Sequence, residues 1–306
     1  MTPDLSVTIG KIKLKNPVMV ASGTFGYAEE YADFIDLKKL GAVVSKTITL
    51  KPRKGNPASR TCETPGGMLN SIGLENPGLE HFIREKLPAL KKTGVPVIVS
   101  IASEKDPWEF ITLTRRLDAL AEVAAIELNI SCPNLKSSTL ISQDPGATHD
   151  LVKAVRKATR KTLITKLSPN VTDITQIARA AESAGSDAVS LVNTLTGMSV
   201  DINTRRPRIA AVIAGLSGPA IRPVALRMVW ETYQKIKIPI IGMGGISDTA
   251  SALEFFIAGA TAISIGTANF INPGVSIEVI AGIKEYLQKN KISSIGKLAG
   301  SLECKI

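Results

Sequence analysis

The chain has 306 residues, of which 44% are hydrophobic and 21% charged, the balance of an ordinary globular protein. It contains no run of about 18 uncharged apolar residues, and Met1–Gly10 lacks the basic and apolar segments of a signal peptide. We therefore expect a cytoplasmic protein with no membrane contact. The net charge is +10, but Lys and Arg are dispersed and only 4% of residues are aromatic, which argues against a nucleic acid partner.

The chain is poor in residues that bind metals. Its cysteines are Cys62, Cys132 and Cys304, and its only histidines are His81 and His149. These residues are far apart in the sequence, and none of the cysteines has the close spacing of zinc or iron–sulfur ligands. The sequence therefore predicts no metal site and no iron–sulfur cluster on this chain.

The predicted elements alternate between strands and helices. Ser6–Ile9 and Ile12–Leu14 flank Gly10-Lys11 and predict a β-hairpin. Eight apolar runs typical of buried parallel strands follow, namely Pro17–Gly23, Ala42–Thr49, Val95–Ala102, Ala125–Cys132, Thr162–Pro169, Ala188–Thr194, Pro239–Ile246 and Ala262–Ala268. Helical spacing of apolar residues marks Phe110–Val123, Leu151–Ala158, Ile174–Ala184, Ala220–Ile236 and Ala250–Ala258. This order predicts one α/β domain over residues 1–306, a (β/α)₈ TIM barrel whose bottom is closed by the N-terminal hairpin.

Two connections between the predicted strands are long. The second and third runs begin 53 residues apart (95 − 42), and the sixth and seventh begin 51 apart (239 − 188). Both long loops follow a strand and so lie on the catalytic face of a barrel, where such loops serve as lids or substrate walls. Gly41, Gly94, Gly185 and Gly259 lie just past predicted helix ends and are expected to be left-handed caps.

Polar residues gather where the predicted strands end, which is where the active site of a TIM barrel lies. Lys46 and Lys166 follow apolar strand residues, and Asn129 and Asn193 occupy similar positions. A single lysine there is more often a solvated rim residue, but two lysine side chains pointing into one barrel require an anionic partner. We therefore expect Lys46 and Lys166 to bind an anionic ligand.

Glycines at the ends of the last two strands indicate a phosphate site. Strand seven ends Gly242-Met243-Gly244-Gly245-Ile246 and strand eight ends Gly266-Thr267-Ala268, while Gly218 precedes the helix at Ala220. Loops after strands seven and eight of TIM barrels recurrently bind phosphate through backbone N–H groups. No G-x-G-x-x-G follows any predicted strand, so a pyridine dinucleotide is disfavoured, and one FMN with its terminal phosphate on the glycines fits better.

The chain resembles the class 1 dihydroorotate dehydrogenases over roughly Leu5 to Pro273. The resemblance is specific in Asn129-Ile130-Ser131-Cys132-Pro133-Asn134 and in Gly67-Met68-Leu69-Asn70-Ser71-Ile72-Gly73-Leu74-Glu75-Asn76-Pro77-Gly78. Asn193-Thr194, Ile241–Ile246 and Gly266–Phe270 follow in the family's order. The opening Gly10–Pro17 is most similar to class 1B, the NAD-linked catalytic subunit.

The resemblance implies an enzyme of pyrimidine (UMP) biosynthesis that oxidises dihydroorotate to orotate, with a role for each matching residue. Cys132 would be the catalytic base that takes the C5 proton, and FMN N5 would take the C6 hydride. FMN would contact Ser22, Lys46, Thr47, Ser100, Asn129, Lys166, Val192, Gly218, Gly244, Gly245, Gly266 and Thr267. The substrate would contact Lys46, Asn70, Ser71, Ile72, Gly73, Leu74, Asn129, Asn193 and Thr194. Cys62 and Cys304, in polar contexts, are expected to have no catalytic role.

Two segments depart from the family pattern. Ser100 stands where the family usually has asparagine, and its shorter hydroxyl would reach the flavin directly or through water. The Leu135–Leu140 loop after Cys132 also differs from the family pattern, and this difference would affect how the lid closes over the site.

Class 1B membership would imply a homodimeric core and a partner subunit. This chain lacks a dinucleotide fingerprint and cluster-ligating cysteines, so FAD and an iron–sulfur cluster would belong to an electron-transfer subunit that passes electrons to NAD. The basic segments Lys51–Lys54 and Arg205–Arg208 lie on the two long loops. They could steer such a partner toward this face, or they could simply be a solvated rim.

Three alternatives remain open at this point. One is a stand-alone class 1A enzyme that reduces fumarate. The second is an FMN enzyme that reduces uridine in RNA, which normally needs a helical RNA-binding domain for which we expect no room after Pro273. The third is a non-redox barrel that holds a phosphorylated ligand.

Overall fold

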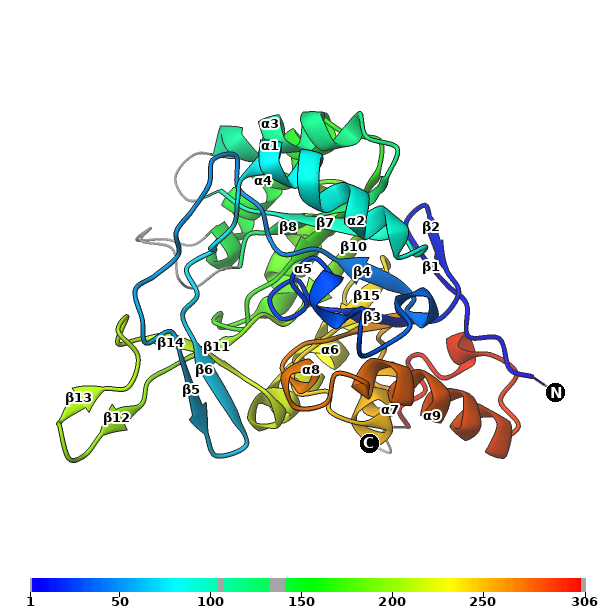
Figure 1. Cartoon of the computed structure of the whole chain (residues 1–306). Coiled ribbons are helices and arrows are strands. Elements are labelled where there is room, and N and C mark those ends of the chain that lie inside the picture. The colour runs from blue at the N-terminus through cyan, green and yellow to red at the C-terminus, as the bar shows by residue number, and fades with distance from the viewer. Residues whose placement is uncertain (1, 104–106, 132–140, 304–306) are drawn as a thin grey trace.

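The computed structural model describes residues 2–103, 107–131 and 141–303 (Figure 1). Its centre is a closed barrel of eight parallel strands, which confirms the predicted (β/α)₈ fold. In order around the ring the strands are β3 (Val18–Val20), β4 (Ala42–Val44), β7 (Val97–Ile101), β8 (Val123–Asn129), β9 (Thr162–Lys166), β10 (Ala188–Leu191), β15 (Ile240–Gly242) and β16 (Ala262–Ile265). Pairing of β16 with β3 closes the ring. Only β8 begins outside its predicted run, two residues early (125 − 123).

Helices surround the barrel on its outer face (Figure 1). The longer ones are α3 (Pro107–Asp118), α4 (Pro145–Arg156), α5 (Ile174–Ser183), α6 (Arg222–Tyr233), α7 (Thr249–Ile257) and α9 (Val275–Lys289). Shorter are α1 (Leu79–His81) and α2 (Leu87–Lys92), joined by the π-helix η3 (Phe82–Lys86), and α8 (Ala268–Ile271). The 3₁₀ helices are η1 (Glu29–Tyr31), η2 (Leu37–Lys39), η4 (Ile141–Gln143), η5 (Pro219–Ile221) and η6 (Ile295–Lys297). Within the described ranges no helix has the length and hydropathy needed to cross a membrane.

The local sequence explains where several helices begin and which face they bury. Asp144, Asp173 and Asp248 cap α4, α5 and α7 by accepting a hydrogen bond from a backbone N–H in the first turn. Along α5, Ile174, Ile177, Ala178 and Ala181 are buried, the spacing of one helix face packed on the barrel.

Helix α3 and the first connection differ from prediction. Helix α3 ends at Asp118 rather than Val123, because β8 already begins at Val123 and residues 119–122 are needed for the turn. Between β3 and β4 the chain forms η1 and η2 instead of an α-helix.

The predicted hairpin forms and lies at the bottom of the barrel. Strands β1 (Val7–Ile9) and β2 (Ile12–Leu14) pair antiparallel. The Lys11 backbone N–H donates to Thr162 Oγ1 over 2.9 Å, at the N-terminal end of β9. A Cβ on Gly10 would lie 2.7 Å from Thr162 Cγ2, so glycine permits this close approach.

Three of the four predicted glycine caps are confirmed. Gly94, Gly185 and Gly259 have φ values of +70°, +99° and +119°. The prediction for Gly41 is wrong, because its φ is not positive. Glycine is required there because a Cβ would lie 2.2 Å from the Asn16 carbonyl oxygen.

The two long loops pair with each other in a second sheet, which the sequence analysis did not predict. The first loop contributes β5 (Thr61–Thr64) and β6 (Gly67–Asn70), and the second β11 (Leu195–Gly197) and β14 (Ala214–Ser217), in the order β11-β14-β6-β5. A further hairpin, β12 (Val200–Asp201) with β13 (Arg206–Pro207), extends outward at the lower left of Figure 1. This loop sheet packs around Leu69, Ile209 and Ala214, and it stands beside the barrel mouth.

Candidate active site

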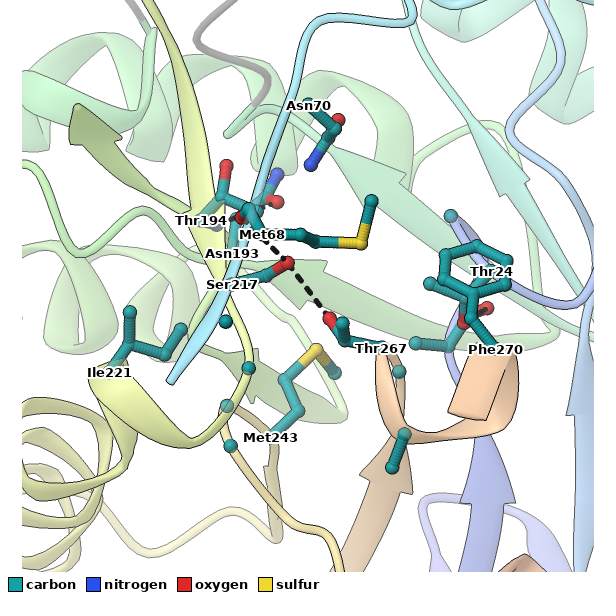
Figure 2. A pocket seen from close by; sticks show the side chains of 18 of the residues that line it. Thr24, Met68, Asn70, Asn193, Thr194, Ser217, Ile221, Met243, Thr267 and Phe270 are labelled. Atoms are coloured by element: carbon teal, nitrogen blue, oxygen red, sulfur yellow. Dashed lines mark hydrogen bonds between the residues drawn. The ribbon is translucent and has the colours of Figure 1, made fainter. Parts of the chain in front are cut away.

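A cavity of about 860 Å³ lies at the C-terminal ends of the barrel strands, with the loop sheet as one wall (Figure 2). Its volume is within the range of small-molecule and cofactor sites, about 300–1,000 Å³. It brings together most of the residues selected from the sequence, namely Ser22, Lys46, Thr47, Asn70, Ile72, Gly73, Leu74, Asn129, Lys166, Val192, Asn193, Thr194, Gly218, Gly244, Gly245, Gly266 and Thr267. Ser71 and Ser100 do not line it, and Cys132 lies outside the described residues, as do Cys304 and the Leu135–Leu140 loop.

Two kinds of glycine line one end of the cavity. Gly218, Gly244 and Gly245 have positive φ values and close neighbours, so the backbone itself requires glycine there. Gly266 has no such requirement, because its φ is not positive and a Cβ would come no closer than 3.7 Å to Ala21. A Cβ on Gly23, which also lines the cavity, would meet no atom within 4 Å. The structure therefore leaves room beside both backbones for a ligand that approaches closely.

Hydroxyl groups stand beside these glycines. Thr267 Oγ1 donates to Ser217 Oγ over 2.8 Å, which ties the end of the eighth barrel strand to the loop sheet (Figure 2). Ser264 Oγ and Thr64 Oγ1 are buried, line the cavity and have no hydrogen-bond partner among the described residues. Backbone donors and free hydroxyls in one place suit an anionic group such as a phosphate.

Ser100 acts one layer below the cavity wall. Its hydroxyl is fully buried and hydrogen-bonds Thr47 Oγ1 at 2.9 Å, and Asn129 Nδ2 donates to the same Thr47 oxygen over 3.1 Å. In this structure Ser100 therefore contacts Thr47, and Thr47 and Asn129 form the surface that a ligand would meet.

The two lysines occupy different positions. Lys166, at the end of β9, is only 5% exposed, and no carboxylate among the described residues forms a salt bridge with it. Lys46 is half-buried and stands between the main cavity and a second cavity of about 560 Å³, which is also lined by Tyr27 and His81. Burial, and secondarily the Glu30 carboxylate, raises the pKa of Tyr27, so its phenol stays protonated beside Lys46.

Asn193 holds the chain next to the predicted base. Its Nδ2 donates to Ser131 Oγ over 2.9 Å and to the Ser131 carbonyl over 3.2 Å, while Ser131 Oγ donates to Asn129 Oδ1. Ser131 is fully buried and directly precedes Cys132. These contacts fix the chain at the cavity wall up to the residue before Cys132.

The segment of residues 70–74 forms the opposite wall. Asn70 Nδ2 donates to the Gly215 carbonyl over 3.3 Å, across the two long loops. Gly73 and Leu74, which both line the cavity, have positive φ. Ser71 faces away, because its hydroxyl accepts a hydrogen bond from Asn56 Nδ2 at 2.7 Å.

Several lining residues were missed from the sequence. Met68, Ile221, Met243 and Phe270 give the cavity apolar walls, and Figure 2 shows the thioethers of Met68 and Met243 directed into it. Further residues not predicted are Thr24, Thr61, Glu63, Thr64, Gly66, Ser217, Ser264 and Ile271. Gly67 and Met68 belong to the motif from Gly67 to Gly78, so the sequence did contain a signal for them. The residues of β5 reach the cavity only because the two long loops pair, which no motif indicates.

This donor set fits FMN. Glycines and hydroxyls at one end suit a phosphate, apolar walls suit a flat ring, and a buried ammonium suits an electron-rich ring edge. Among the described residues no group of three or more His, Cys, Asp or Glu side chains could hold a metal ion.

Comparison with known proteins shows what this chain is similar to over nearly its full length. A sequence model of the dihydroorotate dehydrogenase family matches residues 4–287. The protein of Trichlorobacter lovleyi named dihydroorotate dehydrogenase B (NAD(+)), catalytic subunit, is 53% identical over 304 residues, which cover 99% of this chain and 100% of that protein. Proteins of the same name from Geotalea daltonii and Pelobacter propionicus are 53% and 50% identical, over 98% and 99% of this chain and 99% and 100% of their own lengths.

Proposed function

Because the chain belongs to the dihydroorotate dehydrogenase family of oxidoreductases, we propose that it oxidises dihydroorotate to orotate for pyrimidine synthesis, with one FMN as resident cofactor. The observation that carries the proposal is the cavity at the strand ends. It brings together the glycines at one end (Gly218, Gly244, Gly245 and Gly266), a buried lysine and the amides of Asn129 and Asn193.

The residues at one end of the cavity would hold the FMN phosphate. Gly218, Gly244 and Gly245 present backbone groups at the end of the cavity where Gly266 and Thr267 also lie. When bound, FMN would supply the acceptor for the C6 hydride, at its N5 atom. Lys166 would stabilise the negative charge of the reduced ring, and Ser22, Thr47 and Val192 complete the wall.

The remaining residues would bind and deprotonate the substrate. Lys46 would pair with the substrate carboxylate, and Asn70, Asn193 and Thr194 would orient the pyrimidine ring. Cys132 would remove the C5 proton from the ring face opposite the hydride acceptor. The anchoring of Ser131 supports this role, since a base must be held within reach of its proton.

We further infer that electrons leave through another polypeptide. The relatives are named catalytic subunits and carry NAD(+) in their name, whereas this sequence has no dinucleotide fingerprint and no cluster-ligating cysteines. FAD and an iron–sulfur cluster would belong to that partner, which would bind a homodimer of this chain. Lys51, Lys54 and Arg205–Arg208 are exposed on the long loops and would attract it.

Anaerobic mixing of the purified chain with dihydroorotate tests the proposal. We expect a yellow protein whose flavin absorbance is bleached by dihydroorotate and restored by dyes or oxygen but not by NAD. Adding the electron-transfer subunit is expected to confer NAD reduction. A colourless protein, or a flavin that dihydroorotate leaves oxidised, would contradict the proposed reaction. Rapid NAD reduction by the chain alone would contradict the proposed partner subunit. Fumarate turnover by the chain alone would favour a class 1A enzyme.

Lys46→Ala is expected to weaken orotate binding about 10- to 100-fold, because a charge-assisted hydrogen bond contributes roughly 1.5–3 kcal/mol. Titration of the flavin absorbance with orotate measures the dissociation constant. Lys54→Ala, on the same loop but exposed, is the matched control and should bind orotate like the wild type. Unchanged binding in Lys46→Ala would remove this lysine from the carboxylate site.

A further inference from the structure

A buried carboxylate, Glu127, lies in the barrel interior beneath the cavity. Among the described residues, Glu127 and Lys166 are the only charged side chains that are less than a tenth exposed, at 2% and 5%. An isolated charge in a protein interior is costly, and it is retained where an opposite charge compensates it. Two opposite buried charges in one barrel can compensate each other if they are neighbours.

Strand register shows that they are. In the pairing of β8 with β9, Asn129 lies opposite Lys166 and Glu127 opposite Ile164. Asn129 and Lys166 line the cavity, and side chains alternate along a strand, so Glu127 points to the same interior one layer lower. Glu127 and Lys166 are thus diagonal neighbours on adjacent strands, a separation that long side chains can bridge.

One hydrogen bond places the carboxylate more closely. Ser190 Oγ donates to Glu127 Oε2 over 3.0 Å. Ser190 is on β10, where its register partner is Lys166 of β9. The bond from β8 to β10 therefore spans β9 on its inner face and holds the carboxylate beside the stem of Lys166. The other oxygen, Oε1, has no hydrogen-bond partner among the described residues, and no salt bridge joins Glu127 to Lys166 there, so the two charges interact through space rather than by direct contact.

We propose that Glu127 is a positioning residue for Lys166, and that the negative charge of its carboxylate, held by Ser190, keeps the Lys166 side chain in place at the cavity wall. The proposal rests on the proposed FMN site for its functional consequence. An oxidised flavin ring carries no charge to compensate a lysine, so the protein must supply that compensation before reduction. Glu127 thereby holds the Lys166 ammonium group where it can interact with the reduced ring.

The reduction potential of bound FMN measures the consequence. With a reference dye, Glu127→Gln should shift the reduction equilibrium about tenfold toward oxidised flavin, which is ~30 mV for a two-electron couple. Lys166→Met should shift it in the same direction, and the double variant should match Lys166→Met alone. Ser190→Ala, which only frees the carboxylate, should give a smaller shift of the same sign. Thr165→Val is the matched control, because Thr165 is buried on β9 and its hydroxyl contacts Ser186, away from the cavity.

A second measurement does not depend on flavin. In chemical unfolding of the purified full-length chain, Glu127→Gln and Lys166→Met should each lower the midpoint, and the double variant should lower it by less than their sum. Additive midpoints would overturn the proposed interaction between the Glu127 and Lys166 charges even if the wild type failed to bind FMN or to oxidise dihydroorotate. A wild-type potential in Glu127→Gln, or a shift toward reduced flavin, would overturn its role toward Lys166 while leaving the proposed reaction intact.

Discussion

Replacing Cys132 by alanine is expected to slow reduction of the bound flavin by dihydroorotate by about 10²–10⁴-fold, the usual contribution of a positioned general base. FMN should remain bound, because the predicted cofactor contacts lie on other residues. Cys132→Ser should retain part of the rate and lose it as the pH falls, since an alcohol is a far weaker acid than a thiol. Anaerobic stopped-flow bleaching of the flavin measures each rate.

Cys62→Ala is the matched control for this experiment. Cys62 is a half-buried residue of β5 whose thiol contacts the Glu63 carbonyl, and it does not line the cavity. Its rate of flavin reduction should equal that of the wild type. If Cys132→Ala also bleached at the wild-type rate, Cys132 would not be the base.

Gly266→Val is expected to weaken FMN binding by about a hundredfold or more. Its side chain would fill the space beside a backbone that we propose lies against the phosphate, and two lost charge-assisted bonds amount to roughly 3–6 kcal/mol. The protein should still fold, because a Cβ there meets no atom closer than 3.7 Å. Fluorescence titration of the flavin-free variant with FMN gives the dissociation constant, and thermal unfolding checks the fold.

Gly296→Val separates loss of the ligand from loss of the fold. Gly296 is exposed in η6, its φ is not positive, and a Cβ there meets no atom within 4 Å. This variant has the same steric freedom as Gly266→Val but lies outside the cavity lining, so it should bind FMN normally. Normal FMN binding by Gly266→Val would mean that the phosphate lies elsewhere.

The barrel and much of the cavity lining followed from the sequence because their signals are local. Each barrel strand is a short apolar run whose residues are buried on both faces, and such runs are visible without knowledge of neighbours. Once the runs are placed in a barrel, closure brings all their C-terminal ends together, so Lys46, Asn129 and Lys166 had to converge. The glycines after strands seven and eight converge for the same reason.

The loop sheet and the partners of buried polar groups were decided only by tertiary structure. Asn70 and Gly215 are paired across the two long loops. Backbone hydrogen bonding between short, half-exposed strands leaves little hydrophobic pattern in the sequence, so this pairing could not be predicted. Ser100 was expected at the flavin, but Thr47, which follows β4, lies between its hydroxyl and the cavity. In the same way Glu127 reads as one charge inside an apolar run, and only the register of β8, β9 and β10 shows that it lies beside Lys166. A sequence therefore specifies which segments are buried, whereas contacts between side chains far apart in the chain depend on register and closure, which no local pattern encodes.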